Sequence, residues 1–514
     1  MHSSADRHAA EATWDGHLLA LQASAACRLD IRLDGSRFVE LQADANGRAS
    51  LAMPFSPSGN DIISVQMDLP GTTDDEPMQA FRIEFDKAGL LPATDRYSAT
   101  LAPAGNPLPV AERPLEPEVA IIVPVYNAAA EVRRCLDSVL ASSSGRCRLI
   151  VIDDASTDPE ITPLLAGYRG IDGVDILANP ANLGFTATVN RGMSLAGEAD
   201  VVLLNADTEV AGPWLTGLRH AVHSAPDIAT ATAVSDNAGA FSVPELEHEN
   251  PFPPQWTFAQ TARAHWQAAG HVYPELPTGN GFCMYIRRSI LDEIGLFDVD
   301  AFPQGYGEEN DFCQRACAAG YRHVIAGTVL VRHARSQSFG AERREALGKA
   351  GMQVLRERWP DYESDVGRQL FSYERRVLDW RVRRIHALAA SHVPKPRLLR
   401  YCSLADSAVS PDYDTRMLEM NGKLLCLDGE KVRCRAAAGQ PENMDQTVSC
   451  LLVDHAIELV ELEQGMDPRL SETLQVQADR LGIPMLSLAI GETATFAQRE
   501  AARHSMNRFK RMTR

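Results

Sequence analysis

The pattern of apolar and polar positions changes character along the 514-residue chain, and it alternates in the first part. Residues 28–33 (RLDIRL) and 38–41 (FVEL) place apolar side chains at every second position, with turn residues at Asp34-Gly35 between them. Alternation with a period of two is typical of strands that bury one face. We therefore predict a β-sandwich-like N-terminal domain over residues 1–115.

From residue 116 onward, continuous apolar runs replace this alternation. Residues 119–123, 149–152 and 201–204 are apolar throughout, as in strands buried on both faces, and stretches with helical spacing separate them. Strands that alternate with helices in this way predict a parallel sheet covered on both faces. We expect an α/β fold with a doubly wound, mostly parallel sheet over residues 116–345.

Two further parts follow this sheet. Residues 346–393 have helical spacing and are dense in arginine. Residues 394–514 contain apolar runs at 448–453 and 485–490 with a helical stretch between them, which predicts a small C-terminal α/β domain. Neither part carries a pattern that assigns it a role.

Charge and composition narrow the classes of function. The 50 Lys and Arg residues against 68 Asp and Glu residues give a formal charge of −18, which argues against nucleic acid as a general partner. The N-terminus lacks the regions of a signal peptide, and no apolar run approaches the roughly 18 residues that a membrane span needs. We expect a cytoplasmic protein. Peripheral contact of the basic C-terminal helix with the inner face of a membrane is a second hypothesis.

Polar side chains follow the predicted strand at 201–204. Asn205 and Asp207 stand where the strand ends, and in open α/β sheets this end binds ligands. A carboxylate there suits a divalent cation, which prefers oxygen ligands. By itself the pair is equally well explained as a turn or a helix cap, because Asn and Asp favour both.

Other polar clusters fall at comparable places in the middle domain. They are Pro124, Tyr126 and Asn127 after the first strand, Asp153 and Asp154 after the second, Glu308, Glu309 and Asp311 at a helix start, and His333 after a later strand. Each has a structural explanation of its own, such as a turn, a helix cap, a favourable charge at a helix N-terminus or a buried core histidine. Their joint position at one edge of the predicted sheet favours a functional site.

Seven short motifs occur in an order that resembles glycosyltransferase family 2. They are VPVYN at 123–127, DDASTD at 153–158, NLGF at 182–185, NRG at 190–192, LNAD at 204–207, TGNGF at 278–282 and GEENDF at 307–312. The resemblance covers about residues 118–340. It implies a GT-A fold, a nucleotide-sugar donor, a divalent metal and inversion at the anomeric carbon.

The resemblance also implies roles for individual residues. Those expected to bind the nucleotide are Pro124, Tyr126, Asn127, Asp153, Asp154, Asn190 and Asn205. Asp207 and His333 are expected to hold Mn²⁺ or Mg²⁺, with Asn205 replacing the first aspartate of the family's Asp-x-Asp pattern. Glu309 is the expected catalytic base, and Glu308 and Asp311 are the alternatives.

These inferences predict an inverting transferase that moves a hexosyl or deoxyhexosyl group from a UDP- or dTDP-sugar to a hydroxyl of a glycan or lipid-linked acceptor. The motif at 204–207 resembles rhamnosyl- and galactofuranosyltransferases of bacterial surface polysaccharides. One alternative is a non-catalytic nucleotide-sugar-binding or scaffold protein, against which Asp207 and Glu309 argue. The other is a sugar nucleotidyltransferase, which would need a glycine-rich phosphate loop with a Lys or Arg after the first strand.

Overall fold

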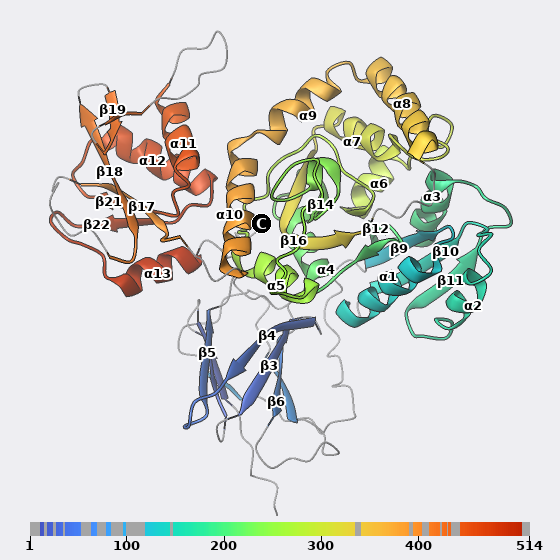
Figure 1. The fold of residues 1–514 in the computed structure, drawn as a ribbon, viewed down its shortest axis with the longest axis horizontal. Coiled ribbons are helices and arrows are strands. Elements are labelled where there is room, and N and C mark those ends of the chain that lie inside the picture. The colour runs from blue at the N-terminus through green and yellow to red at the C-terminus, as the bar shows by residue number, and fades with distance from the viewer. Residues whose placement is uncertain are drawn as a thin grey trace, which may run out of the picture.

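The computed structural model describes residues 119–143, 147–334, 341–389, 394–402, 411–421, 424–428, 430–432 and 443–505, together with the strands and adjoining turns between residues 11 and 98. Three groups of elements follow one another along the chain, with α8, α9 and α10 joining the second to the third (Figure 1). The middle group holds the predicted site residues.

An eight-stranded sheet organises the middle of the chain, in the order β11-β10-β9-β12-β15-β14-β16-β13. Its strands are β9 (Val119–Val125), β10 (Cys147–Asp153), β11 (Val174–Ala178), β12 (Asp200–Leu204), β13 (Thr208–Glu209), β14 (Ile228–Ser235), β15 (Cys283–Ile286) and β16 (Arg322–His333). Neighbouring strands from β11 to β12 are parallel, β15 is antiparallel to both of its neighbours, and β14 is parallel to β16. This confirms the predicted α/β class and the mostly parallel sheet.

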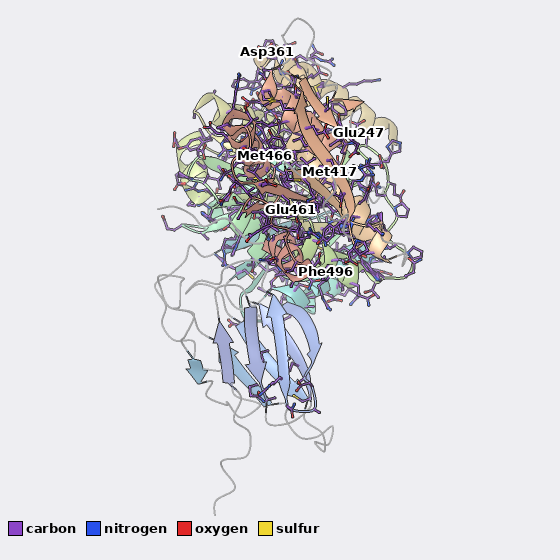
Figure 2. The ribbon with its side chains drawn as sticks, turned by 90° about the vertical axis from the view of Figure 1, so that its left-hand side faces the viewer. Glu247, Asp361, Met417, Glu461, Met466 and Phe496 are labelled. Atoms are coloured by element: carbon purple, nitrogen blue, oxygen red, sulfur yellow. The ribbon has the colours of Figure 1, made fainter. Side chains whose placement is uncertain are left out.

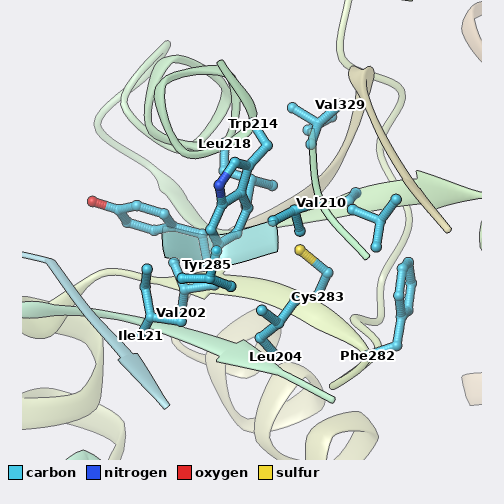
Figure 3. Packing of buried hydrophobic residues seen from close by; sticks show 14 of the residues in the cluster. Ile121, Val202, Leu204, Val210, Trp214, Leu218, Phe282, Cys283, Tyr285 and Val329 are labelled. Carbon is cyan, nitrogen blue, oxygen red and sulfur yellow. The ribbon is translucent and has the colours of Figure 1, made fainter. Parts of the chain in front are cut away.

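Helices cover both faces of this sheet. They are α1 (Ala129–Ser142), α2 (Ile161–Ala166), α3 (Phe185–Leu195), α4 (Trp214–Val222), α5 (Phe258–Ala268), α6 (Arg288–Ile294) and α7 (Glu308–Ala318), with a short 3-10 turn η1 (Gly239–Phe241). In β9, Ile121 belongs to the core shared with α1 and α4, whereas Ile122 belongs to the core shared with α3 and α7. Figure 3 shows the first core, in which Trp214 of α4 packs beside Val202 and Tyr285 of the sheet.

The N-terminal part contains two four-stranded antiparallel sheets, ordered β5-β2-β1-β8 and β4-β3-β6-β7. The strands are β1 (Glu11–Trp14), β2 (Leu18–Gln22), β3 (Arg28–Leu33), β4 (Ser36–Gln42), β5 (Arg48–Ala52), β6 (Ile63–Asp68), β7 (Gln79–Ile83) and β8 (Arg96–Ser98). This matches the β-rich organisation predicted for the region. The predicted boundary at residue 115 lies outside the described residues and stays a prediction.

Three helices and a second α/β sheet complete the chain. The helices are α8 (Ala341–Arg358), α9 (Tyr362–Leu370) and α10 (Tyr373–Ala389). The sheet has the order β20-β19-β18-β17-β21-β22, and Figure 2 faces it with Met417 of β18 and Glu461 of β21 labelled. Its elements are β17 (Arg397–Tyr401), β18 (Asp414–Asn421), β19 (Leu424–Leu427), β20 (Glu430–Lys431), α11 (Met444–Asp454), β21 (Leu459–Glu463), α12 (Pro468–Arg480), β22 (Met485–Leu488) and α13 (Phe496–Ser505).

Arginines of the last helix are engaged inside this C-terminal domain. Arg499 of α13 lies 2.5 Å from Glu461, and Arg503 lies 3.2 Å from Glu458, with both glutamates buried. These two guanidinium groups therefore have partners inside the domain, and a membrane contact would have to use other residues. Among the described helices, none combines the length and the apolar character that crossing a bilayer requires.

Candidate active site

A cleft of about 470 Å³ opens at the C-terminal ends of β9 and β12, a size within the range of small-molecule sites. It brings together most of the predicted site residues. Those that line it are Pro124, Tyr126, Asn127, Asp154, Asn205, Asp207, Glu308, Glu309 and His333. Parallel strands deliver their C-terminal ends to one edge of a sheet, so residues distant in sequence meet here.

Asp207 and His333 lie side by side in this cleft because β13 pairs with the end of β16. Thr208 is opposite His333 in the antiparallel register, and the backbone N–H of Ala334 donates to the carbonyl of Asp207 at 3.0 Å. The Nε2 atom of His333 then lies 3.4 Å from Oδ1 of Asp207. The sequence resemblance implied this meeting, and the strand pairing explains it.

The other side of the His333 ring is fixed by the protein. Its Nδ1 lies 3.0 Å from the carbonyl oxygen of Asn237, and a carbonyl can only accept, so Nδ1 carries the proton. The ring also stacks on Phe282, with the centroids 5.3 Å apart and the planes 14° apart. In the neutral imidazole, Nε2 therefore presents its lone pair toward the carboxylate of Asp207. A histidine held in this way is the usual arrangement of a metal ligand.

The surroundings of this pair fit a divalent cation. Five acidic residues line the cleft, namely Glu131, Asp154, Asp207, Glu308 and Glu309, and no Arg or Lys is found among the described residues that line it. A diphosphate bound here would need a positive charge that the described side chains do not supply. No group of three or more His, Cys, Asp or Glu residues in the described chain could hold a metal. Two protein ligands suit Mg²⁺ or Mn²⁺, because phosphates and water complete the shell of such ions.

Glu308 and Glu309 enter the cleft from the first turn of α7. Gly307 precedes them with φ of 144°, and a Cβ atom there would lie 2.5 Å from Phe302, so this position requires glycine. The backbone N–H of Gly307 donates to Oε2 of Glu308 at 3.0 Å. The Oε2 atom of Glu309 is buried and has no hydrogen-bond partner among the described residues.

The surroundings raise the pKa of both carboxyl groups, and that of Glu308 more than that of Glu309. Burial raises the pKa of Glu308 well above its ordinary value, and the negative charge of Glu309 raises it further. Burial also raises the pKa of Glu309, but hydrogen bonds, including the one from Glu308, counteract part of that rise. We infer that Glu308 keeps its proton and that Glu309 ionises first. A buried carboxylate with a free oxygen is suited to accept a proton.

The wall formed by the turn after β9 is locked by Asn127. Its Oδ1 accepts from the backbone N–H groups of Thr157 and Asp158 at 2.8 and 2.9 Å, and its own N–H donates to Oγ of Ser156 at 2.8 Å. The amide of Asn127 thus joins two loops of the cleft. Its backbone φ of 60° is uncommon for a non-glycine residue, and Asn is among the residues that tolerate it.

Asp154 likewise supports the wall of the cleft. Its carboxylate accepts from the N–H groups of Leu183 and Gly184 at 2.8 and 2.9 Å and from Nδ2 of Asn179 at 2.7 Å. These contacts explain why DDASTD and NLGF occur together, since the first motif holds the second in place. Both lie where the nucleotide was expected.

Three predicted residues do not line the cleft. The side-chain amide of Asn190 donates to the carbonyl of Phe297 at 2.8 Å and accepts from its N–H at 3.1 Å, so Asn190 lies outside the cleft and its nucleotide contact stays a prediction. Asp311 is 1% exposed, and its carboxylate accepts from Arg315, Arg358 and the indole N–H of Trp359, so it lies outside the cleft that contains Glu308 and Glu309. Asp153 accepts from the N–H of Ser156 at 3.0 Å and shapes the loop.

The structure adds residues that sequence reasoning did not assign. Those that also line the cleft include Asn182, Phe185, Thr188, Asn280, Phe282, Gln304 and Tyr306. Tyr306 is exposed at 37% and has φ of 69°, between two glycines that also have positive φ. The motifs NLGF, TGNGF and GEENDF pointed to these segments, but nothing in their spacing showed which side chains face inward.

Comparison with known proteins defines the class of this domain. Residues 120–295 match the family model described as "Glycosyl transferase family 2". The chain therefore carries a glycosyltransferase family 2 domain, as its motifs predicted, and the α/β sheet described above agrees with the fold that this family implies.

The individual relatives match over short segments. An uncharacterized glycosyltransferase, YibD, of Escherichia coli is 31% identical over 94 residues, which is 18% of this chain and 27% of that protein. A glycosyltransferase of PGL/p-HBAD biosynthesis from Mycobacterium bovis is 30% identical over 91 residues, which is 18% of this chain and 36% of that protein. This chain thus spans about a third of the length of these relatives.

One solved structure resembles part of this chain. The mannosyltransferase PcManGT from Pyrobaculum calidifontis, in complex with GDP-Man and Mn²⁺, has a TM-score of 0.36 and 17% identity, covering 56% of this chain and 80% of that one. A likeness at this level supports no detail of the present site.

Proposed function

We propose that this chain transfers a sugar from a nucleoside diphosphate to a hydroxyl group of a glycan or lipid-linked acceptor, with inversion at the anomeric carbon. One observation carries the proposal. A single cleft contains Asp207 and His333, 3.4 Å apart, and the buried Oε2 of Glu309, which has no hydrogen-bond partner among the described residues. A divalent ion held by Asp207 and His333 would neutralise the leaving diphosphate, and the carboxylate of Glu309 would accept the proton of the attacking hydroxyl.

The donor nucleotide would bind along the wall after β9 and β12. Pro124, Tyr126, Asn127, Asp154 and Asn205 all line the cleft there. The amide of Asn127 and the carboxylate of Asp154 hold the loops in place, so the wall is formed before the ligand arrives. Preorganisation of this kind lowers the cost of binding because few groups have to be ordered.

Asp207 and His333 would hold Mn²⁺ or Mg²⁺ against the diphosphate. A bound divalent ion neutralises the negative charge that develops on the leaving group. His333 is prepared for this role by the hydrogen bond from its Nδ1 to Asn237, which directs Nε2 toward the site.

Glu309 would act as the base in a single displacement. The acceptor oxygen attacks the anomeric carbon as the bond from that carbon to the diphosphate oxygen breaks, and the hydroxyl proton passes to Glu309. One attack from the face opposite the leaving group inverts the configuration. Glu308 donates its hydrogen bond to Glu309, so the pair carries one negative charge in place of two.

The donor class is the first thing to test. We propose a UDP- or dTDP-linked hexose or deoxyhexose, and the melting temperature with UDP, dTDP, GDP or CDP in the presence of Mn²⁺ measures the preference. A bound nucleotide at about 100 times its Kd stabilises the folded state by about 2.7 kcal/mol. We expect UDP or dTDP to give the largest shift.

Turnover then separates the proposed activity from its alternatives. With a panel of nucleotide sugars, a glycosyltransferase releases the nucleoside diphosphate in a metal-dependent reaction. Nucleotide binding without turnover of any donor would favour a scaffold protein, whereas formation of nucleotide sugar from a sugar phosphate and a nucleoside triphosphate would identify a nucleotidyltransferase.

A further inference from the structure

The side of His333 that faces away from the cleft is held by the loop after β14. The carbonyl oxygen of Asn237 accepts from Nδ1 of His333 at 3.0 Å, and Oδ1 of Asp236 accepts from the backbone N–H of His333 at 2.9 Å. Both the ring and the backbone of His333 therefore depend on where residues 236 and 237 lie.

This loop folds back on itself through two buried serines. The N–H of Asn237 donates to Oγ of Ser235 at 3.1 Å, and the N–H of Ala238 donates to Oγ of Ser242 at 2.9 Å. The N–H of Val243 donates to the carbonyl of Ser235 at 3.0 Å and closes the loop. A shift of Ser242 would therefore move the carbonyl that holds His333.

Arg375 of α10 fixes the loop at its far end. Its Nη1 donates to the carbonyl of Ala240 and its Nη2 to the carbonyl of Ser242, each at 2.6 Å, while Nε contacts Oδ1 of Asp379 at 3.0 Å. The side chain of Arg375 is fully buried. All three guanidinium nitrogens are thus used, and Asp379 balances the buried charge.

A stack of aromatic rings gives a second connection to the same histidine. Phe241 lies between the two carbonyls that Arg375 binds, and it is buried against Phe282 with ring centroids 6.4 Å apart. Phe282 in turn stacks on His333. The position of η1 is therefore transmitted to the imidazole through packing as well as through the Asn237 carbonyl.

We propose that Arg375 is a positioning residue for the metal site, acting through the loop at 237–242 on His333. The inference rests on the proposed function, in which His333 is a ligand of the donor's metal ion. The functional unit already reaches beyond the segment that matches the family model, residues 120–295, through Glu309 and His333, and Arg375 adds the helix α10 to it. The helical part that follows the sheet thereby gains a role in donor binding.

Binding of Mn²⁺ in the presence of UDP or dTDP, whichever stabilises the protein more, tests this without an activity assay. Free Mn²⁺ is measured by its electron paramagnetic resonance signal in full-length protein. The variant Arg375→Met with Asp379→Leu removes the buried pair without leaving one charge unpaired. We expect it to bind Mn²⁺ about tenfold more weakly, at the low end of what loss of a metal ligand's hydrogen-bond partner costs.

Two other variants make the result specific. Arg375→Lys keeps the charge beside Asp379 and can reach one carbonyl, so we expect a smaller loss of Mn²⁺ affinity. This variant also tests the inference if the double variant does not fold. Arg383→Gln is the matched control, because Arg383 lies on the same helix and contacts Glu245 and the carbonyl of Pro244, but is half exposed. We expect Arg383→Gln to leave the Mn²⁺ affinity unchanged.

The role of His333 is tested by a double-mutant cycle. If Arg375 acts through His333, its substitution should weaken Mn²⁺ binding in the wild-type background and have little further effect when His333 is already alanine. The inference is overturned if folded Arg375 variants bind Mn²⁺ as the wild type does, or if they lose the same factor in both backgrounds. If wild-type protein binds nucleotide but no Mn²⁺, the metal part of the proposed function fails as well.

Discussion

Glu308 and Glu309 are adjacent, acidic and both in the cleft, yet their surroundings predict opposite outcomes for the same substitution. Glu309→Gln replaces the proposed base with a side chain of the same shape that cannot take a proton. Glu308→Gln replaces a carboxyl that is protonated in our reading with an amide that can still donate to Glu309 and accept from the N–H of Gly307. The first should inactivate the enzyme and the second should not.

The magnitudes follow from these roles. Loss of a general base typically lowers the rate by about 10²- to 10⁴-fold, which corresponds to about 2.7–5.4 kcal/mol of transition-state stabilisation. For Glu308→Gln both hydrogen bonds have a replacement, so we expect kcat within about threefold of wild type, or less than about 1 kcal/mol. Nucleotide binding should be unchanged in both variants, because neither carboxyl belongs to the proposed nucleotide wall.

The pH dependence adds a second measurement. Burial raises the pKa of Glu309, and the base must be ionised to act, so activity should fall with decreasing pH at a higher pH than for an ordinary glutamate. Replacing Glu308 with leucine removes a hydrogen bond that lowers the pKa of Glu309, so this acid limb should move to still higher pH. When folding raises the pKa of a carboxyl group, the free energy of unfolding decreases as the pH rises through that pKa. Because this applies to Glu308, Glu308→Gln should melt at a higher temperature than wild type at neutral pH.

The assay is release of the nucleoside diphosphate together with the anomeric configuration of the product by NMR. Melting temperatures with and without nucleotide show that each variant is folded and binds its donor. Near-wild-type turnover by Glu309→Gln with intact binding would refute its role as the base. Equal inactivation of Glu308→Gln and Glu309→Gln would refute the division of roles between them, and a product with retained configuration would refute the single displacement.

Further substitutions probe the metal pair and the loop before α7. Asp207→Ala should weaken Mn²⁺ binding at least about 100-fold, because it removes a proposed ligand and not only a hydrogen-bond partner of one, and unchanged metal dependence would contradict this. Gly351→Ala in α8 would place a Cβ atom only 1.8 Å from the carbonyl oxygen of Tyr306, so we expect a loss of about 1–3 kcal/mol in stability and lower activity. Gly348→Ala on the same helix meets nothing within 4 Å and should stabilise by up to about 1 kcal/mol; equal effects of the two would argue against the contact.

The sequence predicted the parts of the fold that depend on local pattern. Continuous apolar runs marked β9, β10 and β12 because strands covered on both faces have no polar side. The pairing of β13 with β16, which brings Asp207 to His333, joins segments far apart in the chain. No local pattern encodes such a contact, so only the family resemblance placed the two residues together.

The predicted residues that lie outside the cleft show where motif order stops being informative. Thr188 lines the cleft, and Asn190 follows two residues later on the same helix, about 200° around its axis, so it faces Phe297 on the other side. Asp311 stands in a similar relation to Glu309 and reaches Arg358 and Trp359 instead of the cleft. A motif records that a residue is present in the right order, whereas its role depends on the direction in which its side chain leaves the helix.

Helix α10 shows the same limit for charge. An arginine-rich helix is expected to present a solvated face, yet Arg375 and Arg381 are 0% and 2% exposed. Arg375 donates to backbone carbonyls of the loop after β14. Arg381 donates to the backbone carbonyl of Ala269, just after α5, and to that of Gly482, just after α12. Arg383 on the same helix is half exposed. Arginines of the same helix thus serve both as buried hydrogen-bond donors and as surface charges, and composition does not distinguish the two. The domain boundary predicted at residue 345 therefore separates His333 from Arg375, which we infer act on one metal site.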